Sequence, residues 1–99
     1  MWYILEGFDA PEGLARRPAL REAHLARAKQ LLAEGRLLLI GPMPAIDTPD
    51  PGPAGFSGSL VVAEFASLEA AREWIAQDPY TLGGVFERTQ ARPFNKVLP

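Results

Sequence analysis

The sequence predicts an α+β fold, in which two helices cover one face of an antiparallel sheet in the ferredoxin-like order βαββαβ. Two observations predict it. Four short runs rich in branched and aromatic residues have the composition of strands, and they alternate with two longer stretches of helical apolar period. Clusters of glycine, proline and aspartate separate them, and no repeat or change of composition divides the chain. We therefore expect a single domain over residues 1–99.

The first half of the chain predicts a strand, a long helix and a second strand. Trp2–Phe8 is rich in aromatic and branched residues and ends in turn formers at 9–13. From Pro18, a residue favoured in a first helical turn, an apolar helical pattern continues to Gly35, which suits a left-handed stop. Arg36–Pro42 predicts the second strand.

Met43–Gly58 contains four prolines and three glycines, so neither a helix nor a strand ladder is expected to persist through it. The segment predicts a long loop, which covers a pocket or reaches across a dimer.

The second half predicts a strand at Ser59–Phe65 and a helix at Leu68–Gln77 with a serine N-cap. Asp78 suits the cap of one further short turn, which Pro79 opens and two glycines close. Val85–Ala91 then predicts a last, more polar strand.

Composition excludes several classes of function. The chain has no cysteine and one histidine, which rules out a disulfide frame, a catalytic thiolate and a multi-histidine metal site, so we expect neither a metal nor another cofactor. A formal net charge of −2 with interspersed charges offers no basic surface to nucleic acid or an anionic membrane. The apolar runs, such as Leu37–Ile40, are too short to span a membrane, and no targeting signal is visible. We expect a cytoplasmic protein with a small-molecule partner.

The predicted strands are apolar on both faces. In Trp2–Leu5 and Leu37–Ile40 successive side chains point to opposite sides of the sheet, yet both sides are apolar. Helices can cover one face only, and a large exposed apolar face favours aggregation. We therefore expect a homodimer formed through the second sheet face.

His24 is placed on the apolar face of the first helix, together with Leu20, Ala28 and Leu31. A histidine in such a place is more often a packed core residue than a functional one. A buried imidazole still needs hydrogen-bond partners, and a carboxylate partner would fix its tautomer and raise its basicity. The residues alone leave both interpretations open.

Several ordered segments resemble the YciI-like family, over nearly the whole chain from Trp2 to Val97. They are Arg21–Leu25, Gly41–Ala45, Gly55–Ser59, Asp78–Tyr80 with Gly84-Val85, and Arg92–Val97. The resemblance implies a dimeric α+β barrel protein, cytoplasmic and small, from a family of mostly unassigned activity. It also implies a histidine and an aspartate at the centre of the site, here His24 and Asp78, with Ser59 as a lesser candidate.

Further candidates for substrate binding are Tyr80, Arg17 and Arg21. The two arginines, with Arg16, are expected around the start of the first helix, where they could bind an anion together with free backbone N–H groups, although solvated arginines are commoner. Tyr80 either packs or faces the substrate.

The pairing of His24 with Asp78 raises a geometric question. We take both helices to run opposite to parallel central strands, which need not bring the start of one near the end of the other. The pairing then comes either from the turn after Gln77 or from the other subunit.

Two classes of function remain. In one, a His24–Asp78 dyad performs general acid/base proton transfer, lyase- or isomerase-like, on a small polar and cyclic or aromatic metabolite. In the other, the protein binds a small ligand without chemistry or serves as an accessory dimerisation module.

Overall fold

The computed structural model describes residues 1–99 and has the predicted α+β architecture. Its elements are β1 (Trp2–Asp9), α1 (Gly13–Ala33), β2 (Leu37–Pro44), a 3-10 turn η1 (Gly52–Ala54), β3 (Phe56–Glu64), α2 (Leu68–Ala76), α3 (Pro79–Leu82) and β4 (Phe86–Phe94). The predicted order βαββαβ is confirmed, with α3 in place of the short turn that we expected after Asp78.

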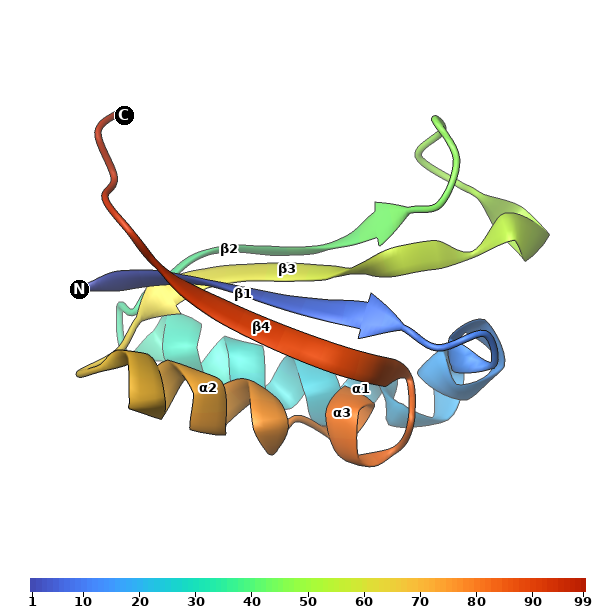
Figure 1. Cartoon of the computed structure of the whole chain (residues 1–99), viewed down its shortest axis with the longest axis horizontal. Helices are drawn as coiled ribbons and strands as arrows, with labels where there is room; N and C mark the ends of the chain where they lie inside the picture. The colour runs from blue at the N-terminus through green and yellow to red at the C-terminus, as the bar shows by residue number, and fades with distance from the viewer.

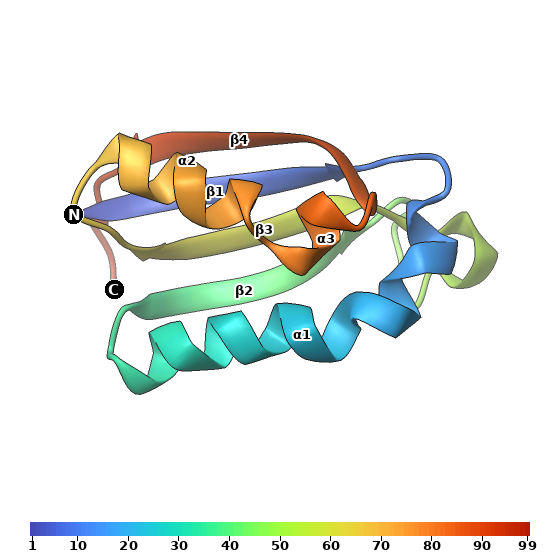
Figure 2. The same ribbon diagram turned by 90° about the horizontal axis from the view of Figure 1, so that it is seen from below.

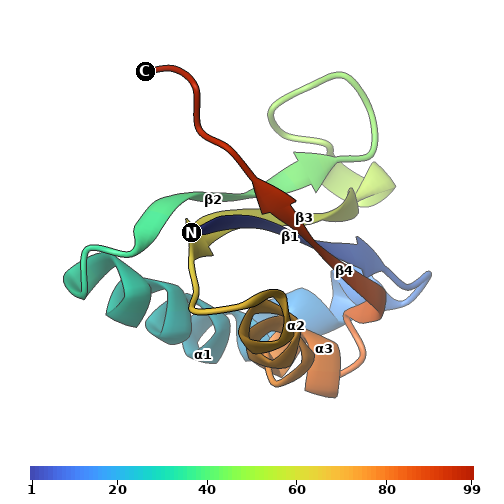
Figure 3. The same ribbon diagram turned by 60° about the vertical axis from the view of Figure 1, so that its left-hand side comes forward.

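The four strands form one antiparallel sheet in the order β2-β3-β1-β4. The helices lie together on one face of this sheet, while the loop after β2 and the C-terminal tail project from the other side (Figure 1). The view in Figure 2 shows α1 and α2 side by side under the sheet, and Figure 3 shows the two layers nearly end-on.

The central strands β1 and β3 are antiparallel, so our expectation of parallel central strands is wrong. β1 ends at Asp9, at the end of the sheet where α1 begins. β3 ends at the opposite end of the sheet, where α2 begins. α2 therefore runs back toward the start of α1. β4 begins at that same end of the sheet, where Phe86 pairs with Asp9. The topology itself brings the first helix and the end of the second helix together.

α1 begins at Gly13, five residues before the predicted start at Pro18. The Gly13 N–H binds the carbonyl of Ala10, and Gly13 is packed so closely that a side chain there would meet the carbonyl of Val85. Pro18 is exposed inside the helix, where it withholds one N–H. The predicted stop is confirmed, because Gly35 follows the helix with φ of 72°.

The loop between β2 and β3 is shorter than Met43–Gly58, because both ends of that segment belong to strands. Met43 pairs with Gly58 and Pro44 with Phe56 at the exposed edge strand β2. Proline is tolerated there, since an edge strand leaves half of its N–H groups unpaired. The last strand likewise extends beyond Ala91 to Phe94.

Two apolar clusters lie between the sheet and the helices. The larger one, under α2 and the second half of α1, consists of Tyr3, Leu5, Leu31, Val61, Ala63, Phe65, Ala71, Ile75 and Ala91. The smaller one consists of Tyr80, Val85 and Phe86, with Leu20 against it. The Phe86 ring occupies the space over Gly7, where a Cβ atom would lie 2.3 Å from the ring. His24 packs against this smaller cluster, through Tyr80.

The sheet face away from the helices is uncovered within the chain. It carries Trp2, Ile4, Phe8, Leu39, Leu60 and Phe94, with charged neighbours toward β4. Arg88 lies over the Phe8 ring at 3.9 Å, and Arg92 pairs with Glu6 at 3.3 Å. None of the helices has both the length and the apolar character required to cross a membrane.

Candidate active site

His24 and Asp78 form a direct hydrogen bond within one chain. Nδ1 of the imidazole lies 2.7 Å from Oδ2 of the carboxylate, and the two side chains are 7% and 1% exposed. The two residues come from α1 and from the cap of α3, which the antiparallel helices bring to the same end of the sheet. The pairing of His24 with Asp78 therefore does not require a second subunit.

Asp78 accepts from three directions. Oδ2 also accepts from the backbone N–H of Tyr80 at 3.0 Å, which confirms the predicted N-cap. Oδ1 accepts from Nη1 of Arg27 at 3.2 Å. Because an ionised carboxylate can only accept, the bond to His24 places a proton on Nδ1, so the neutral form of the ring carries its lone pair on Nε2.

The imidazole of His24 lies flat against the ring of Tyr80. Their centroids are 3.9 Å apart with an interplanar angle of 4°. The Phe86 ring packs edge-on against the Tyr80 ring, with 5.6 Å between the centroids. Stacking on Tyr80, which is itself held by Phe86, therefore fixes the plane of the imidazole, and the bond to Asp78 fixes its rotation within that plane. The ring is preorganised before any ligand arrives.

Burial raises the pKa of the Tyr80 hydroxyl above its usual range, and the nearby Asp78 carboxylate acts in the same direction. The guanidinium groups of Arg17 and Arg21 oppose this effect, so both lie close enough to the hydroxyl to influence it. At neutral pH Tyr80 therefore presents a protonated phenol, a hydrogen-bond donor.

Arg17 is buried, contrary to the solvated arginine that is commoner at such positions. Its guanidinium donates to both carboxylate oxygens of Asp9, at 2.9 and 2.7 Å, and lies over the rings of Phe56 and Tyr80. Nη2 also reaches Ser59 Oγ at 3.3 Å. Arg17 thus links the end of β1, strand β3 and the stacked rings.

The placement of Arg17 and Arg21 around the start of the first helix is wrong. Because α1 begins at Gly13, Arg17 and Arg21 lie beyond the first turn, where backbone N–H groups are already used by the helix. Arg16 instead donates to the carbonyl of Gly84 at 2.9 Å. Any anion binding must therefore use side chains.

A cavity of about 190 Å³ lies between α1 and strands β2 and β3. Its lining includes five of the six residues predicted from the sequence, namely Arg17, Arg21, His24, Ser59 and Tyr80. Asp78 lies directly behind His24 and lines a small adjoining space of about 10 Å³. All six predicted residues therefore gather at one place.

Nε2 of His24 faces this cavity. The ring makes one hydrogen bond, at Nδ1. Every buried polar side-chain atom in the protein has a partner, so Nε2, which has none, is not fully buried. Because His24 also lines the cavity, Nε2 is reached from that side. The geometry can support proton transfer between Nε2 and a bound molecule.

Sequence reasoning missed two residues of the site, Asp9 and Arg27. Arg27 follows His24 by three positions on α1, a spacing that places both side chains on one face and could have revealed it. Arg27 also donates to the backbone carbonyl of Trp74 at 2.8 Å, and its guanidinium lies 4.3 Å from the centroid of the Trp74 ring. Asp9 gave no local signal, because its role depends on the distant Arg17.

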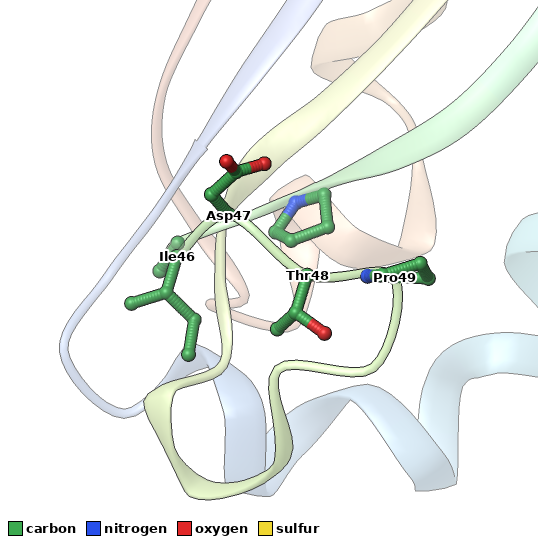
Figure 4. Close-up of a pocket in the computed structure, with 6 residues that line it drawn as sticks. Ile46, Asp47, Thr48 and Pro49 are labelled. Carbon is green, nitrogen blue, oxygen red and sulfur yellow. The ribbon is translucent and has the colours of Figure 1, made fainter.

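A hollow larger than the cavity at His24 has no part in this site. It measures about 540 Å³ and lies within the bend of the loop after β2, lined by the consecutive residues 44–49 (Figure 4). No residue between Ala45 and Gly55 lines the cavity at His24. No group of three or more metal-ligating side chains is assembled anywhere in the chain.

Comparison with known proteins gives a consistent result. The protein YciI of Escherichia coli O6:H1 and an uncharacterized protein of Haemophilus influenzae are each 53% identical over 98 residues, which cover 99% of this chain and 100% of each relative. Among solved structures, the 5-chloro-2-hydroxyhydroquinone dehydrochlorinase TftG of Burkholderia phenoliruptrix AC1100, in complex with 2,5-dihydroxybenzoquinone, superposes with a TM-score of 0.80. It is 24% identical, and the match covers 96% of this chain and 94% of TftG.

A family model of the YCII-related domain matches residues 1–95, which include every residue of the cavity. This match agrees with the similarity suggested by the sequence segments around His24 and Asp78. The chain belongs to the YCII-related domain family.

Proposed function

We propose that this protein is an enzyme that moves a proton on a small polar molecule, with His24 as the general acid/base. One observation carries the proposal. His24 donates from Nδ1 to a buried carboxylate at 2.7 Å, while Nε2 faces a cavity large enough for a small molecule. This is the arrangement in which a carboxylate orients an imidazole and stabilises its protonated form.

In the proposed step, Nε2 takes a proton from a carbon or oxygen of the substrate. The imidazolium that forms lies beside the Asp78 carboxylate, which stays ionised and supplies the opposite charge. Return of the proton to another atom of the substrate completes an isomerisation, and its delivery to a leaving group completes an elimination. General acid/base catalysis of this kind contributes about 10²–10⁴-fold to a rate.

Covalent catalysis by Ser59 has less support. Its hydroxyl accepts from Arg17 at 3.3 Å and lies within strand β3, without the strained turn that exposes a nucleophilic serine. Ser59 is better suited to contact a substrate or to hold Arg17 in place.

The fold is compatible with this chemistry. TftG, which superposes over most of the chain, is a dehydrochlorinase with a small cyclic compound bound. Removal of a proton and a chloride ion from such a compound is an elimination. The cavity of about 190 Å³ suits a substrate of similar size, small and cyclic or aromatic.

A second candidate function uses the same cavity without chemistry. His24 is buried, stacked and hydrogen-bonded, as a packed histidine in a ligand-binding or accessory dimerisation module also would be. The two candidates differ in whether a proton ever leaves the bound molecule.

Proton exchange distinguishes them without knowledge of the complete reaction. Small cyclic and aromatic compounds with acidic C–H bonds are incubated with the protein in D₂O, and deuterium incorporation is followed by NMR. Incorporation that is lost in His24→Gln and retained in Arg72→Gln supports the enzyme, because Arg72 is exposed on α2 and away from the cavity. Saturable binding without incorporation for any compound that enters the cavity would favour the binding module.

The proposal includes a homodimer that covers the open sheet face. That face carries large apolar side chains from all four strands, and the chain has no element left to cover them. A two-fold axis would place the same face of a second copy against it, since closed symmetric dimers use one surface twice.

A further inference from the structure

Arg21 differs from the other arginines around the dyad because it has no acidic partner. Arg17 is paired with Asp9 at 2.7 Å, and Arg27 with Asp78 at 3.2 Å. Arg21 lines the cavity from the exposed side of α1, and no carboxylate lies within ion-pair distance of it. The positive charge of Arg21 therefore remains available to a ligand in the cavity.

The local charges leave an excess of one positive charge. The guanidinium groups of Arg17, Arg21 and Arg27 lie around the dyad with only two carboxylates, those of Asp9 and Asp78. No acidic side chain lines the cavity itself. A ligand with a single negative charge would balance the site, whereas a cation would be repelled.

Arg21 and Tyr80 present hydrogen-bond donors to the same space. Both line the cavity, and the guanidinium is near enough to affect the Tyr80 hydroxyl. A guanidinium, which is always charged, and a protonated phenol together are a strong pair of donors for an oxyanion. Tyr80 is held rigidly, since it is 2% exposed and stacked on His24.

The opposite wall of the cavity is apolar and comes from Leu25, Ile40 and Pro42. The volume of about 190 Å³ is that of roughly six water molecules, too small to enclose a nucleotide or a peptide. The ligand that fits therefore combines a small apolar body with one charged oxygen.

We infer that the cavity binds a small organic monoanion, such as a carboxylate, phenolate or enolate, with its charged oxygen on Arg21 and the Tyr80 hydroxyl and its apolar body against β2. The inference rests on the proposed function for the position of the reacting proton, at Nε2 of His24. When Nε2 takes that proton, the electron pair of the broken bond stays on the ligand. The two donors then stabilise the added negative charge on its oxygen.

A matched pair of probes tests the inference. Benzoate and benzamide have nearly the same shape, and only benzoate is charged at neutral pH. His24 is the only histidine, so its ring protons give an unambiguous NMR signal with which to follow a titration by either probe. We expect saturable shifts, with benzoate bound roughly tenfold more tightly than benzamide. Arg21→Gln should remove this preference, and Arg72→Gln, an exposed arginine on α2, should keep it.

Equal affinities for the two probes, absence of binding by both, or a preference that survives Arg21→Gln would overturn the inference. Asp78→Asn separates it from the proposed function. If the titration of His24 is unchanged in Asp78→Asn but benzoate still binds through Arg21, the dyad proposal fails and the anion site stands. If the titration moves to lower pH but no preference for benzoate exists, the anion site fails alone.

Discussion

Nη1 of Arg27 lies 3.2 Å from Oδ1 of Asp78, the oxygen opposite to the one that binds His24. The carboxylate is therefore held from both sides, by a histidine that can change its charge and by an arginine that cannot. Arg27 does not line the cavity and its hydrogen bonds go to Asp78 and the Trp74 carbonyl, so it acts on the dyad through Asp78 as a positioning residue.

Replacement of Arg27 by glutamine is expected to move the titration of His24 to higher pH, because the loss of a nearby positive charge favours the imidazolium. The shift should be modest, since the Arg27 side chain is 27% exposed and partly screened. NMR titration of the His24 ring measures it. An unchanged titration would show that Arg27 supports only the Trp74 carbonyl.

Replacement of Asp78 by asparagine should move the same titration in the opposite direction. The amide roughly preserves the shape and the helix cap, but it removes the charge that stabilises the imidazolium. The His24 ring should therefore titrate at lower pH, and proton exchange into a substrate should fall by about 10²–10⁴-fold. A packed histidine held by backbone groups predicts no change in titration and a clear loss of stability in His24→Ala instead.

Tyr80 predicts a loss of stability at alkaline pH. Burial raises the pKa of its hydroxyl in the folded protein, whereas the unfolded chain has the ordinary value of 10.0. As the pH rises through 10.0, the unfolded state loses this proton while the folded state keeps it, so the free energy of unfolding falls. The slope is at most about 1.4 kcal/mol per pH unit for one proton.

Urea unfolding from about pH 9 to about pH 11 measures this dependence in the natural protein and in Tyr80→Phe. The phenylalanine variant should show a shallower decline, because it removes one titrating group and leaves the others unchanged. Equal slopes in the two proteins would refute the assignment to Tyr80.

Asp9→Asn should destabilise the protein more than the simultaneous removal of both partners. The asparagine variant leaves the guanidinium of Arg17 buried without its carboxylate, at a cost of about 3–5 kcal/mol, or a fall in Tm of about 12 °C or more. In the double variant Asp9→Leu with Arg17→Met no buried charge remains, so thermal unfolding should show a smaller loss. A greater loss in the double variant would contradict this account of the ion pair.

The open sheet face predicts a dimer in solution. Light scattering at micromolar concentration should give twice the chain mass of 10.8 kDa. Leu60→Lys, on the open face, should yield monomers, whereas Leu32→Lys, at a 61% exposed leucine on α1, should remain dimeric. A monomeric natural protein would remove the explanation for strands that are apolar on both sides.

The inward position of His24 could be predicted from the sequence because it depends on a local rule. A helix brings His24 onto the same face as Ala28 and Leu31, and both of these are buried with it. The same period puts Arg17 and Arg21 seven and three positions before His24, which explains why all three line one cavity. The cap role of Asp78 could be predicted for a similar reason, since a cap before proline has a local signature, whereas its place beside His24 followed only from the family resemblance.

The partners of the arginines could not be predicted in this way. The pairs Asp9–Arg17 and Arg27–Asp78 depend on which ends of β1, α1 and α3 meet in space, which local patterns do not specify. The start of α1 was misplaced because Pro18 has a strong local preference, while the packing at Gly13 involves the distant Val85. The direction of the central strands, in contrast, follows from the order of elements and could have been derived.

The absence of a side chain at Gly7 has a consequence for mutational surveys. Phe86 fills the space over Gly7, Tyr80 packs edge-on against Phe86, and His24 stacks on Tyr80, so a single methyl group on β1 would push on the imidazole through two intervening rings. A saturation screen scored by turnover would then rank Gly7 among the functional positions, although it contacts neither the dyad nor the cavity. Aligned relatives with a larger residue at this position would need a smaller ring in place of Phe86, and such paired changes offer a way to trace the His24 pocket through sequences alone.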